Sequence, residues 1–135
     1  MRHANHLILS IILFCTACSV TTVPLHDIHN AIISGYGSKP PTLHDVHAAL
    51  LRAAAIKGWS IEDIAPGHAI GRIVVRGKHH VAIDISYTSE TISMTYIDSS
   101  NMDYERRDDG KYIHLHYNSW VSELLRTLRK ELSQL

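Results

Sequence analysis

Hydrophobic residues recur with a helical spacing in two parts of the chain, which predict two helices. In the first part, apolar side chains from Leu43 to Lys57 follow one face of a helix. Thr42 and Asp45 occupy the two reciprocal positions of a capping box, and Gly58 suits the left-handed residue that follows a helix. In the second part the spacing runs from Tyr117 to Leu132, and basic residues in its C-terminal half complement the helix dipole.

Between these helices the hydrophobic positions alternate with polar ones, as in half-buried strands. Val81–Tyr87 and Ile92–Tyr96 are two such stretches, and a turn centred on Ser89-Glu90 keeps their apolar side chains together. The expected pairs are Tyr87 with Ile92, Ile85 with Met94, and Ile83 with Tyr96. A further strand over Trp59–Ile64 ends at the turn signal Ala65-Pro66-Gly67.

The hairpin upstream of these strands allows two registers. A two-residue turn at Gly77-Lys78 would place Ile73 against Ala82 and split the apolar face. A loop of residues 77–79 keeps this face together, and we therefore expect the odd-length loop. The pairs that it predicts are Val75 with Val81, Ile73 with Ile83, and Arg72 with Asp84.

The order helix, four antiparallel strands, helix predicts a two-layer α+β domain over residues 42–135, with both helices on one face of the meander. The opposite face of the sheet would be polar, as is usual for antiparallel sheets. The residues expected there are Arg72, Arg76, His80, Asp84, Ser86, Thr91, Ser93 and Thr95.

The N-terminal residues have the order of a bacterial lipoprotein signal: a basic start, an apolar run over 7–14, and small residues before Cys18. The apolar run is shorter than the ~20 residues that cross a bilayer. Residues 1–17 are therefore expected to be a signal peptide, and Cys18 the lipidated N-terminus. Cys15 stands where such signals usually have Leu, but modification of Cys15 would put the bulky Phe14 at the cleavage position.

Residues 18–41 are expected to form the lipidated N-terminus and a flexible tether, because 34–41 are rich in Gly, Ser and Pro. Such a coil would span about 25 to 30 Å. Within it, 25–33 could form a short helix of marginal stability. Ser19, directly after the lipidated cysteine, favours the periplasmic side of the outer membrane, since retention in the inner membrane typically requires Asp there.

Charge and cysteine content exclude several classes of function. Loss of Arg2 with the signal leaves 12 basic against 13 acidic residues, so no strong field attracts nucleic acid. Both cysteines, Cys15 and Cys18, precede the folded region, which therefore has neither disulfides nor thiolate chemistry. We expect no cofactor and no nucleic-acid partner.

The segment between the last strand and the last helix carries a recognisable order of residues. It reads Tyr96-x-Asp98-Ser99-x-Asn101-Met102-x-Tyr104, and then Ile113-His114-x-x-Tyr117-Asn118-x-Trp120-Val121. This order resembles a family of small uncharacterised proteobacterial lipoproteins, with Met102 where Leu is usual, and the similarity spans about residues 43–130. The resemblance implies an envelope lipoprotein with this α+β architecture, and it implies no particular activity.

The same segment has a structural and a functional interpretation. In the structural one, its short polar side chains bond local turns and its aromatic side chains cover the edge of the core. In the functional one, a group of polar side chains lines a pocket for a ligand or partner where loop meets helix. That group is Asp98, Ser99, Asn101, Tyr104, His114 and Asn118.

The sequence gives less support to a catalytic site or a metal site than to a binding pocket. Ser99, His114 and Asp98 have the residue types of a catalytic triad, but the chain has no Gly-x-Ser-x-Gly motif, and neighbouring side chains point apart on an extended segment. The chain has 11 histidines, and His44 and His47 lie one helical turn apart, but no His-Glu-x-x-His motif occurs.

We therefore expect neither a catalytic site nor a metal site. The predicted function is a non-enzymatic envelope binding module, held at the bilayer through Cys18, with an envelope protein or a small ligand as its partner. The alternative is a small hydrolase, or a metal-binding or pH-sensing protein, that uses the segment 98–118 and the histidines.

Overall fold

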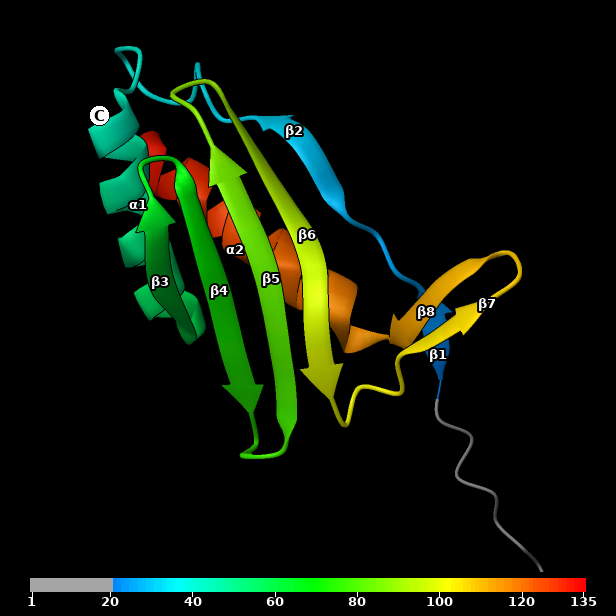
Figure 1. Ribbon diagram of the computed structural model, residues 1–135. Helices are drawn as coiled ribbons and strands as arrows, with labels where there is room; N and C mark the ends of the chain where they lie inside the picture. Colours follow the sequence, from blue (N-terminus) through cyan, green and yellow to red (C-terminus); the bar gives the residue numbers. More distant parts are fainter. Residues whose placement is uncertain (1–20) are drawn as a thin grey trace, which may run out of the picture.

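Two antiparallel sheets and two helices make up residues 21–135, the part of the chain that the computed structural model describes (Figure 1). The elements are β1 (Thr22–Pro24), β2 (Ile28–Ile32), α1 (Leu43–Lys57), β3 (Trp59–Ala65), β4 (His68–Val75), β5 (His79–Tyr87), β6 (Thr91–Ser100), β7 (Glu105–Arg107), β8 (Gly110–His114) and α2 (His116–Leu132). The predicted α+β class is confirmed.

Both predicted helices form, and local signals define the ends of α1. The Thr42 hydroxyl accepts a hydrogen bond from the Asp45 amide, and the Asp45 carboxylate accepts one from the Thr42 amide, which completes the capping box. Gly58 ends the helix with a φ of 80°, a left-handed conformation that glycine adopts without strain. Helix α2 begins at His116, one residue before its predicted start.

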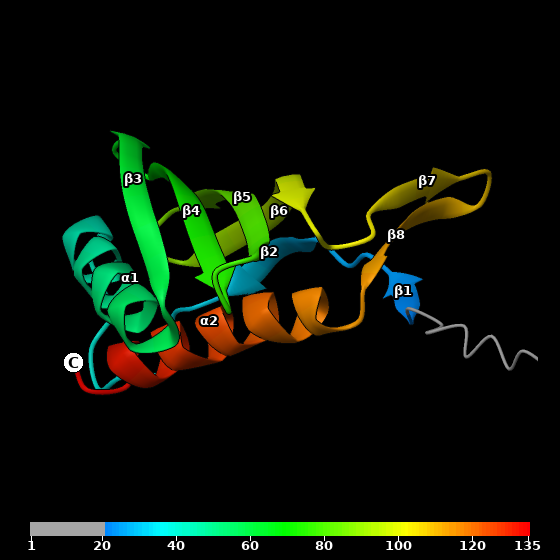
Figure 2. The ribbon, with the colours of Figure 1, turned by 90° about the horizontal axis from the view of Figure 1, so that it is seen from below.

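The larger sheet has five strands in the order β2-β6-β5-β4-β3, and both helices cover one of its faces (Figure 2). The predicted four-stranded meander is thus present, and β2 extends it beyond β6. Side chains from this face and from both helices form the core. Its largest fully buried members include Leu50, Ile83, Ile85, Ile92, Met94, Tyr117, Leu124 and Leu128.

The predicted register between β5 and β6 is confirmed, with Tyr87 opposite Ile92, Ile85 opposite Met94, and Ile83 opposite Tyr96. A bulge follows, since the register shifts between Ala82 and Ile83. This bulge displaces the end of β6 relative to β5 and re-aims the side chains after Tyr96. Alternation of buried and exposed residues was sufficient to predict the pairing up to the bulge.

The predicted register between β4 and β5 is wrong. The loop has three residues, as expected, but it consists of 76–78, so that Val75 lies opposite His79. Arg76 and Gly77 have φ values of 54° and 67°, and the Lys78 amide donates to the Val75 carbonyl. Positive φ at both central residues is what a type I′ turn requires. Both odd-length loops keep the same apolar face together, so the turn geometry decided between them.

As a consequence, the predicted pairing of Arg72 with Asp84 is also wrong. Arg72 lies opposite Ala82 and forms an ion pair with Glu62. Asp84 lies opposite Ile70, and its carboxylate contacts the His68 ring instead (2.6 Å).

The expectation of a flexible tether over 18–41 is corrected for its described part, residues 21–41. Here β1 pairs with β8 and β2 pairs with β6, so the short helix expected over 25–33 does not form. Ile33 is fully buried, and the Arg129 guanidinium donates two hydrogen bonds to the Ile32 carbonyl (2.8 and 3.0 Å). The segment forms strands because the free edges of β8 and β6 pair with its backbone, and Ile33 joins the buried core while Ile32 stays exposed.

The smaller sheet, in the order β1-β8-β7, extends away from the larger one as a hairpin (Figures 1 and 2). The signal peptide expected over 1–17 and the lipidated Cys18 lie outside the described residues. Within residues 21–135, neither helix is long and apolar enough to cross a membrane.

Candidate functional site

Four of the six residues predicted for a pocket line one cleft. Asp98, Ser99, Asn101 and Tyr104 belong to a cleft of about 580 Å³, which we call the polar cleft, at the C-terminal end of β6. Its further lining residues are Tyr96, Ile97, Met102, Asp103, Arg106 and Lys111. The polar cleft therefore lies between the end of the large sheet and the β7–β8 hairpin.

Local hydrogen bonds shape the loop that forms the floor of the polar cleft. Asn101 has a φ of 55°, and its side-chain amide donates to the Lys78 carbonyl (2.9 Å). The Asn101 carbonyl accepts from Nδ1 of His79 (2.7 Å), and the neighbouring Met102 is buried. Asn is among the few residues that tolerate this left-handed conformation. Asn101 thus ties the end of β6 to the β4–β5 turn, which supports the structural interpretation of this residue.

Tyrosines form one wall of the polar cleft. The rings of Tyr96 and Tyr104 stack with centroids 4.5 Å apart and an interplanar angle of 15°, and Tyr117 meets Tyr96 edge-on at 5.8 Å. The Tyr96 hydroxyl and the Ser99 hydroxyl lie 2.8 Å apart, at hydrogen-bond distance. Burial raises the pKa of Tyr96 and, more strongly, that of Tyr117, so both phenols are neutral at physiological pH. The wall is uncharged and offers aromatic faces.

Two cations face the polar cleft from neighbouring strands. Arg106 on β7 and Lys111 on β8 are directly opposite each other, and both line the cleft. Like charges at directly opposite positions of an antiparallel pair destabilise it. Among residues 21–135, no ion pair within 4.0 Å involves Arg106 or Lys111. These two cations are available to an external anion.

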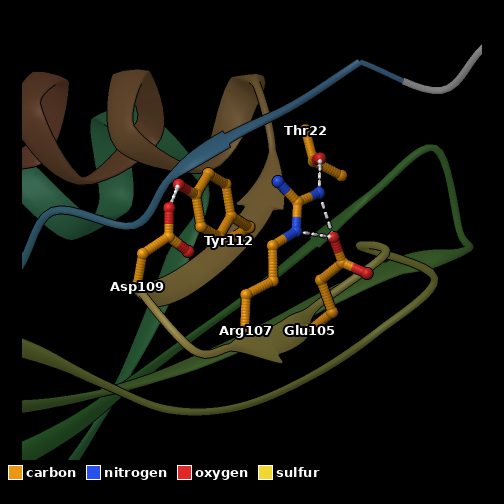
Figure 3. A network of polar contacts seen from close by, with 5 residues as sticks. All are labelled: Thr22, Glu105, Arg107, Asp109 and Tyr112. Carbon is orange, nitrogen blue, oxygen red and sulfur yellow. Dashed lines mark hydrogen bonds and ion pairs between the residues drawn. The ribbon is translucent and has the colours of Figure 1, made fainter.

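The opposite face of the same hairpin differs, because its cation is already neutralised (Figure 3). The Arg107 guanidinium forms an ion pair with Glu105, donates to the Thr22 hydroxyl (3.1 Å) and lies 3.8 Å from the centre of the Tyr112 ring. The Tyr112 hydroxyl in turn donates to the Asp109 carboxylate (2.8 Å). Arg107 therefore has a structural role, since it links the hairpin to β1.

The other two predicted pocket residues lie elsewhere. The Asn118 side chain donates to the Pro24 carbonyl (2.9 Å) and accepts from the His26 amide (3.0 Å), so it holds the chain between β1 and β2. His114 lines a second cleft of about 330 Å³, which we call the histidine–tryptophan cleft. Its lining residues are Val75, Arg76, His79, His114, His116 and Trp120.

The three imidazoles of the histidine–tryptophan cleft lie close together. The His114 ring is 5.7 Å from that of His79 and 5.0 Å from that of His116, between centroids. Burial, followed by the neighbouring His116 and His79, lowers the pKa of His114. Within the described residues, however, no three His, Cys, Asp or Glu side chains are placed to share a metal ion.

The residue types of a triad are not aligned in this arrangement. The Ser99 hydroxyl contacts Tyr96, the Asp98 carboxylate accepts from the Ser99 amide (2.8 Å), and Nδ1 of His114 accepts from the His116 amide (3.3 Å). Ser99 and His114 line different clefts. Of the helical histidine pair, His47 contacts both carboxylate oxygens of Asp63 at 3.0 Å.

Sequence reasoning missed Arg106, Lys111 and a third cleft. The turn residues around Asp109-Gly110 would have indicated a hairpin, but not its register. In the structure the turn consists of Asp108 and Asp109, which places Arg106 opposite Lys111. The third cleft, of about 440 Å³ and mainly apolar, lies between the β3–β4 turn and the start of α1. Its lining residues include Leu43, His47, Asp63, Ile64, Pro66 and Tyr87. No local sequence signal brings those segments together.

Comparison of the chain with protein-family models, with curated proteins and with solved structures gives no significant match. The resemblance to a family of small lipoproteins therefore stays a prediction.

Proposed function

We propose that this chain is an envelope lipoprotein, anchored through acylated Cys18 on the periplasmic side of the outer membrane, whose domain binds a small zwitterionic ligand in the polar cleft. The basic start, the short apolar run and the small residues before Cys18 support the anchor. The cleft supports binding rather than catalysis, because its polar groups are bonded to local backbone and hydroxyls rather than to one another as nucleophile and base.

The observation that carries the binding role is the pair of unneutralised cations. Arg106 and Lys111 repel each other across the hairpin, and an anion between them would convert this repulsion into two charge-assisted hydrogen bonds. The guanidinium and the ammonium together suit a carboxylate or a phosphate.

The polar cleft also offers negative charge. Asp98 and Asp103 line it, and no ion pair among the described residues joins either of them to Arg106 or Lys111. A ligand with both an anionic and a cationic group would neutralise both sides of the cleft. The stacked Tyr96 and Tyr104 add an aromatic wall against which a short apolar part can pack. Amino acids and short peptides with free ends have this chemistry.

Thermal unfolding of the purified lipoprotein in detergent tests the ligand class with three probes: alanyl-alanine, its N-acetyl derivative and its C-terminal amide. Only the free dipeptide carries both charges. A ligand present at about 100 times its Kd stabilises the fold by about 2.7 kcal/mol, which raises Tm by several degrees. We expect that rise with the free dipeptide and a smaller one with either derivative.

A matched pair of variants on the two faces of the hairpin provides the control. Arg106→Gln combined with Lys111→Gln should abolish the rise in Tm, whereas Arg107→Gln, on the opposite face, should retain it. Equal rises with all three probes, or no rise with any, would contradict the proposal.

The anchor has a separate test. Cys18→Ser should block incorporation of labelled palmitate and release the protein from the membrane fraction, whereas Cys15→Ser should leave both unchanged. The opposite result, with labelling lost only in Cys15→Ser, would show that the cleavage assignment is wrong.

A further inference from the structure

The described chain begins beside the histidine–tryptophan cleft. The Thr21 carbonyl accepts a hydrogen bond from the Leu115 amide (3.3 Å), and Leu115 lies between His114 and His116, two residues of that cleft. Strand β1 follows immediately and pairs with β8. Backbone hydrogen bonds therefore hold the point at which the chain enters the domain next to this cleft.

Cys18 precedes Thr21 by only three residues. Three residues of fully extended chain span at most about 11 Å. The polar headgroup layer of each leaflet is about 6 Å thick, half the difference between a total thickness of about 42 Å and a hydrocarbon core of about 30 Å. With an acylated Cys18, Thr21 would therefore lie at most about 5 Å outside the headgroup layer, so the domain cannot stand far from the bilayer.

We infer that the face around the histidine–tryptophan cleft rests on the bilayer, with the cleft holding the phosphate of a phospholipid headgroup. This inference rests on the proposed acylation of Cys18. Arg76 and the imidazoles of His79, His114 and His116 line the cleft, and no carboxylate from residues 21–135 does. Guanidinium and imidazole N–H groups donate to phosphate oxygens.

The residues around the cleft have the character of a membrane interface. Trp120 forms one wall, with its ring 6.2 Å from that of His116, and the neighbouring Leu115 is 39 % exposed. Tryptophan is enriched at the level of lipid headgroups because it has an apolar body and one N–H donor. Lys78, on the same turn as Arg76, is exposed and adds a second cation.

The β4–β5 turn positions Arg76 at an energetic cost. Its φ of 54° is uncommon for a residue other than Gly, Asn or Asp, and type I′ turns usually have Asn at this position. Strained backbone of this kind concentrates at functional sites. The strain therefore fits a role for the Arg76 side chain beyond the turn itself.

Two imidazoles and one carboxylate act on His114. His79 and His116 face it from β5 and α2, and Asp103 is the carboxylate that acts on it from the β6–β7 loop. Burial and the two imidazoles lower the pKa of His114, and a bound phosphate would counter this by stabilising the protonated ring.

The test uses the full, acylated protein in vesicles of phosphatidylethanolamine with a minor fraction of phosphatidylglycerol. The mature chain has no cysteine except Cys18, so Ser119→Cys and Glu90→Cys each introduce one free thiol for a fluorophore. Ser119 lies in the first turn of α2 beside Trp120, and Glu90 lies in the β5–β6 turn at the opposite end of the molecule (Figure 1). Both residues are exposed.

We expect aqueous iodide to quench the Ser119→Cys label several-fold less than the Glu90→Cys label. Arg76→Gln with His116→Gln should raise iodide access to the Ser119→Cys label. If this double variant loses its fold by circular dichroism, the comparison of the two labels in the unaltered background still decides. Equal quenching of both labels, with acylation of Cys18 verified by mass spectrometry, would overturn the inference and leave the anchor intact.

Two further outcomes distinguish a wrong anchor from a wrong assignment of the phosphate. A mass spectrum without acyl chains on Cys18 would overturn the proposed anchor and this inference together. Inorganic phosphate is the remaining probe. Its addition could change the NMR chemical shifts of Trp120 and the three histidines while iodide still reaches the Ser119→Cys label freely in vesicles. That combination would assign the cleft to free phosphate and overturn the docking on lipid.

Discussion

The two ends of the molecule use their charges in different ways. At the end with the β3–β4 turn and the start of α1, carboxylates and imidazoles pair internally: His47 with Asp63 at 3.0 Å, and His68 with Asp84 at 2.6 Å. At the opposite end, where the described chain begins, no ion pair among residues 21–135 involves the cationic side chains that line the two clefts. Those side chains are Arg76, Arg106 and Lys111.

This difference separates structural charges from those available to a ligand. Charges paired inside the fold link secondary structure elements, as His47 links α1 to β3. Unpaired charges that converge on one cleft keep their full attraction for an external group. The first end instead offers an apolar cleft with Ile64 49 % exposed. In the orientation that we infer from an anchor at Cys18, the histidine–tryptophan cleft faces the bilayer and the apolar cleft lies at the end away from it.

The largest expected effect on stability comes from placing alanine at Gly67, where the backbone is tightly packed. The matched substitution at Gly77, at the other end of the molecule, meets open space. A Cβ atom on Gly67 would lie 2.6 Å from the Tyr87 carbonyl oxygen, whereas one on Gly77 would have no neighbour within 4 Å. Both residues have positive φ, 77° and 67°. Gly67→Ala should destabilise the domain by about 3 kcal/mol and Gly77→Ala by about 1 kcal/mol, measured by urea denaturation. Equal losses would show that the two turns are equally constrained.

The next effect tests whether Asn118 is structural. Asn118→Ala removes both hydrogen bonds to the chain between β1 and β2, and we expect a loss of about 2 kcal/mol in the free energy of unfolding, at about 1 kcal/mol for each bond. Asn118→Asp keeps the acceptor for the His26 amide and should lose about half as much. Unchanged stability in Asn118→Ala would favour the ligand-binding interpretation of this residue.

Asn101 and Asp98 both line the polar cleft, but we expect only Asn101 to contribute substantially to the stability of the fold. Asn101→Ala should cost about 1 to 2 kcal/mol, because it breaks the bond to the Lys78 carbonyl and places alanine at a positive φ. Asp98→Ala should cost under about 0.5 kcal/mol, since within the described part of the chain the exposed carboxylate accepts a hydrogen bond only from the Ser99 amide. Thermal melts of both variants check this order, and the reverse order would contradict it.

The smallest effect is the pH dependence contributed by His114. Burial and two neighbouring imidazoles lower its pKa in the folded state below the ordinary value of 6.5, so the unfolded chain takes up a proton first. Its contribution to stability is therefore complete above about pH 6.5 and is lost as the pH falls through the folded pKa. Measured by urea denaturation, the free energy of unfolding of His114→Gln should fall less with decreasing pH than that of the unaltered protein. Superimposable profiles would mean that His114 titrates normally.

Much of the fold followed from local patterns. The limits of α1 were predicted because the capping box at Thr42 and the glycine at position 58 act within one turn of the helix. The β5–β6 register was predicted because alternation sets which side of a strand each residue faces, and the short turn then leaves one favourable alignment.

Only the tertiary structure decided the rest. Residues 21–41 belong to the segment predicted as a tether, but β1 and β2 form within it because β8 and β6 offer free edges, and Ile33 joins the buried core. The β4–β5 register depended on turn geometry, since both odd-length loops bury the same side chains.

The candidate site, too, was predicted only in part from the sequence. Its six predicted residues divide among two clefts and one structural contact, and His79 joins His114 although 35 positions separate them in the chain. The amino-acid sequence by itself determined the apolar faces of the two helices and of the four-stranded meander, and both ends of α1. Which distant segments lie side by side depends on the free energy of long-range contacts, and that free energy is not contained in the spacing of residues along the chain.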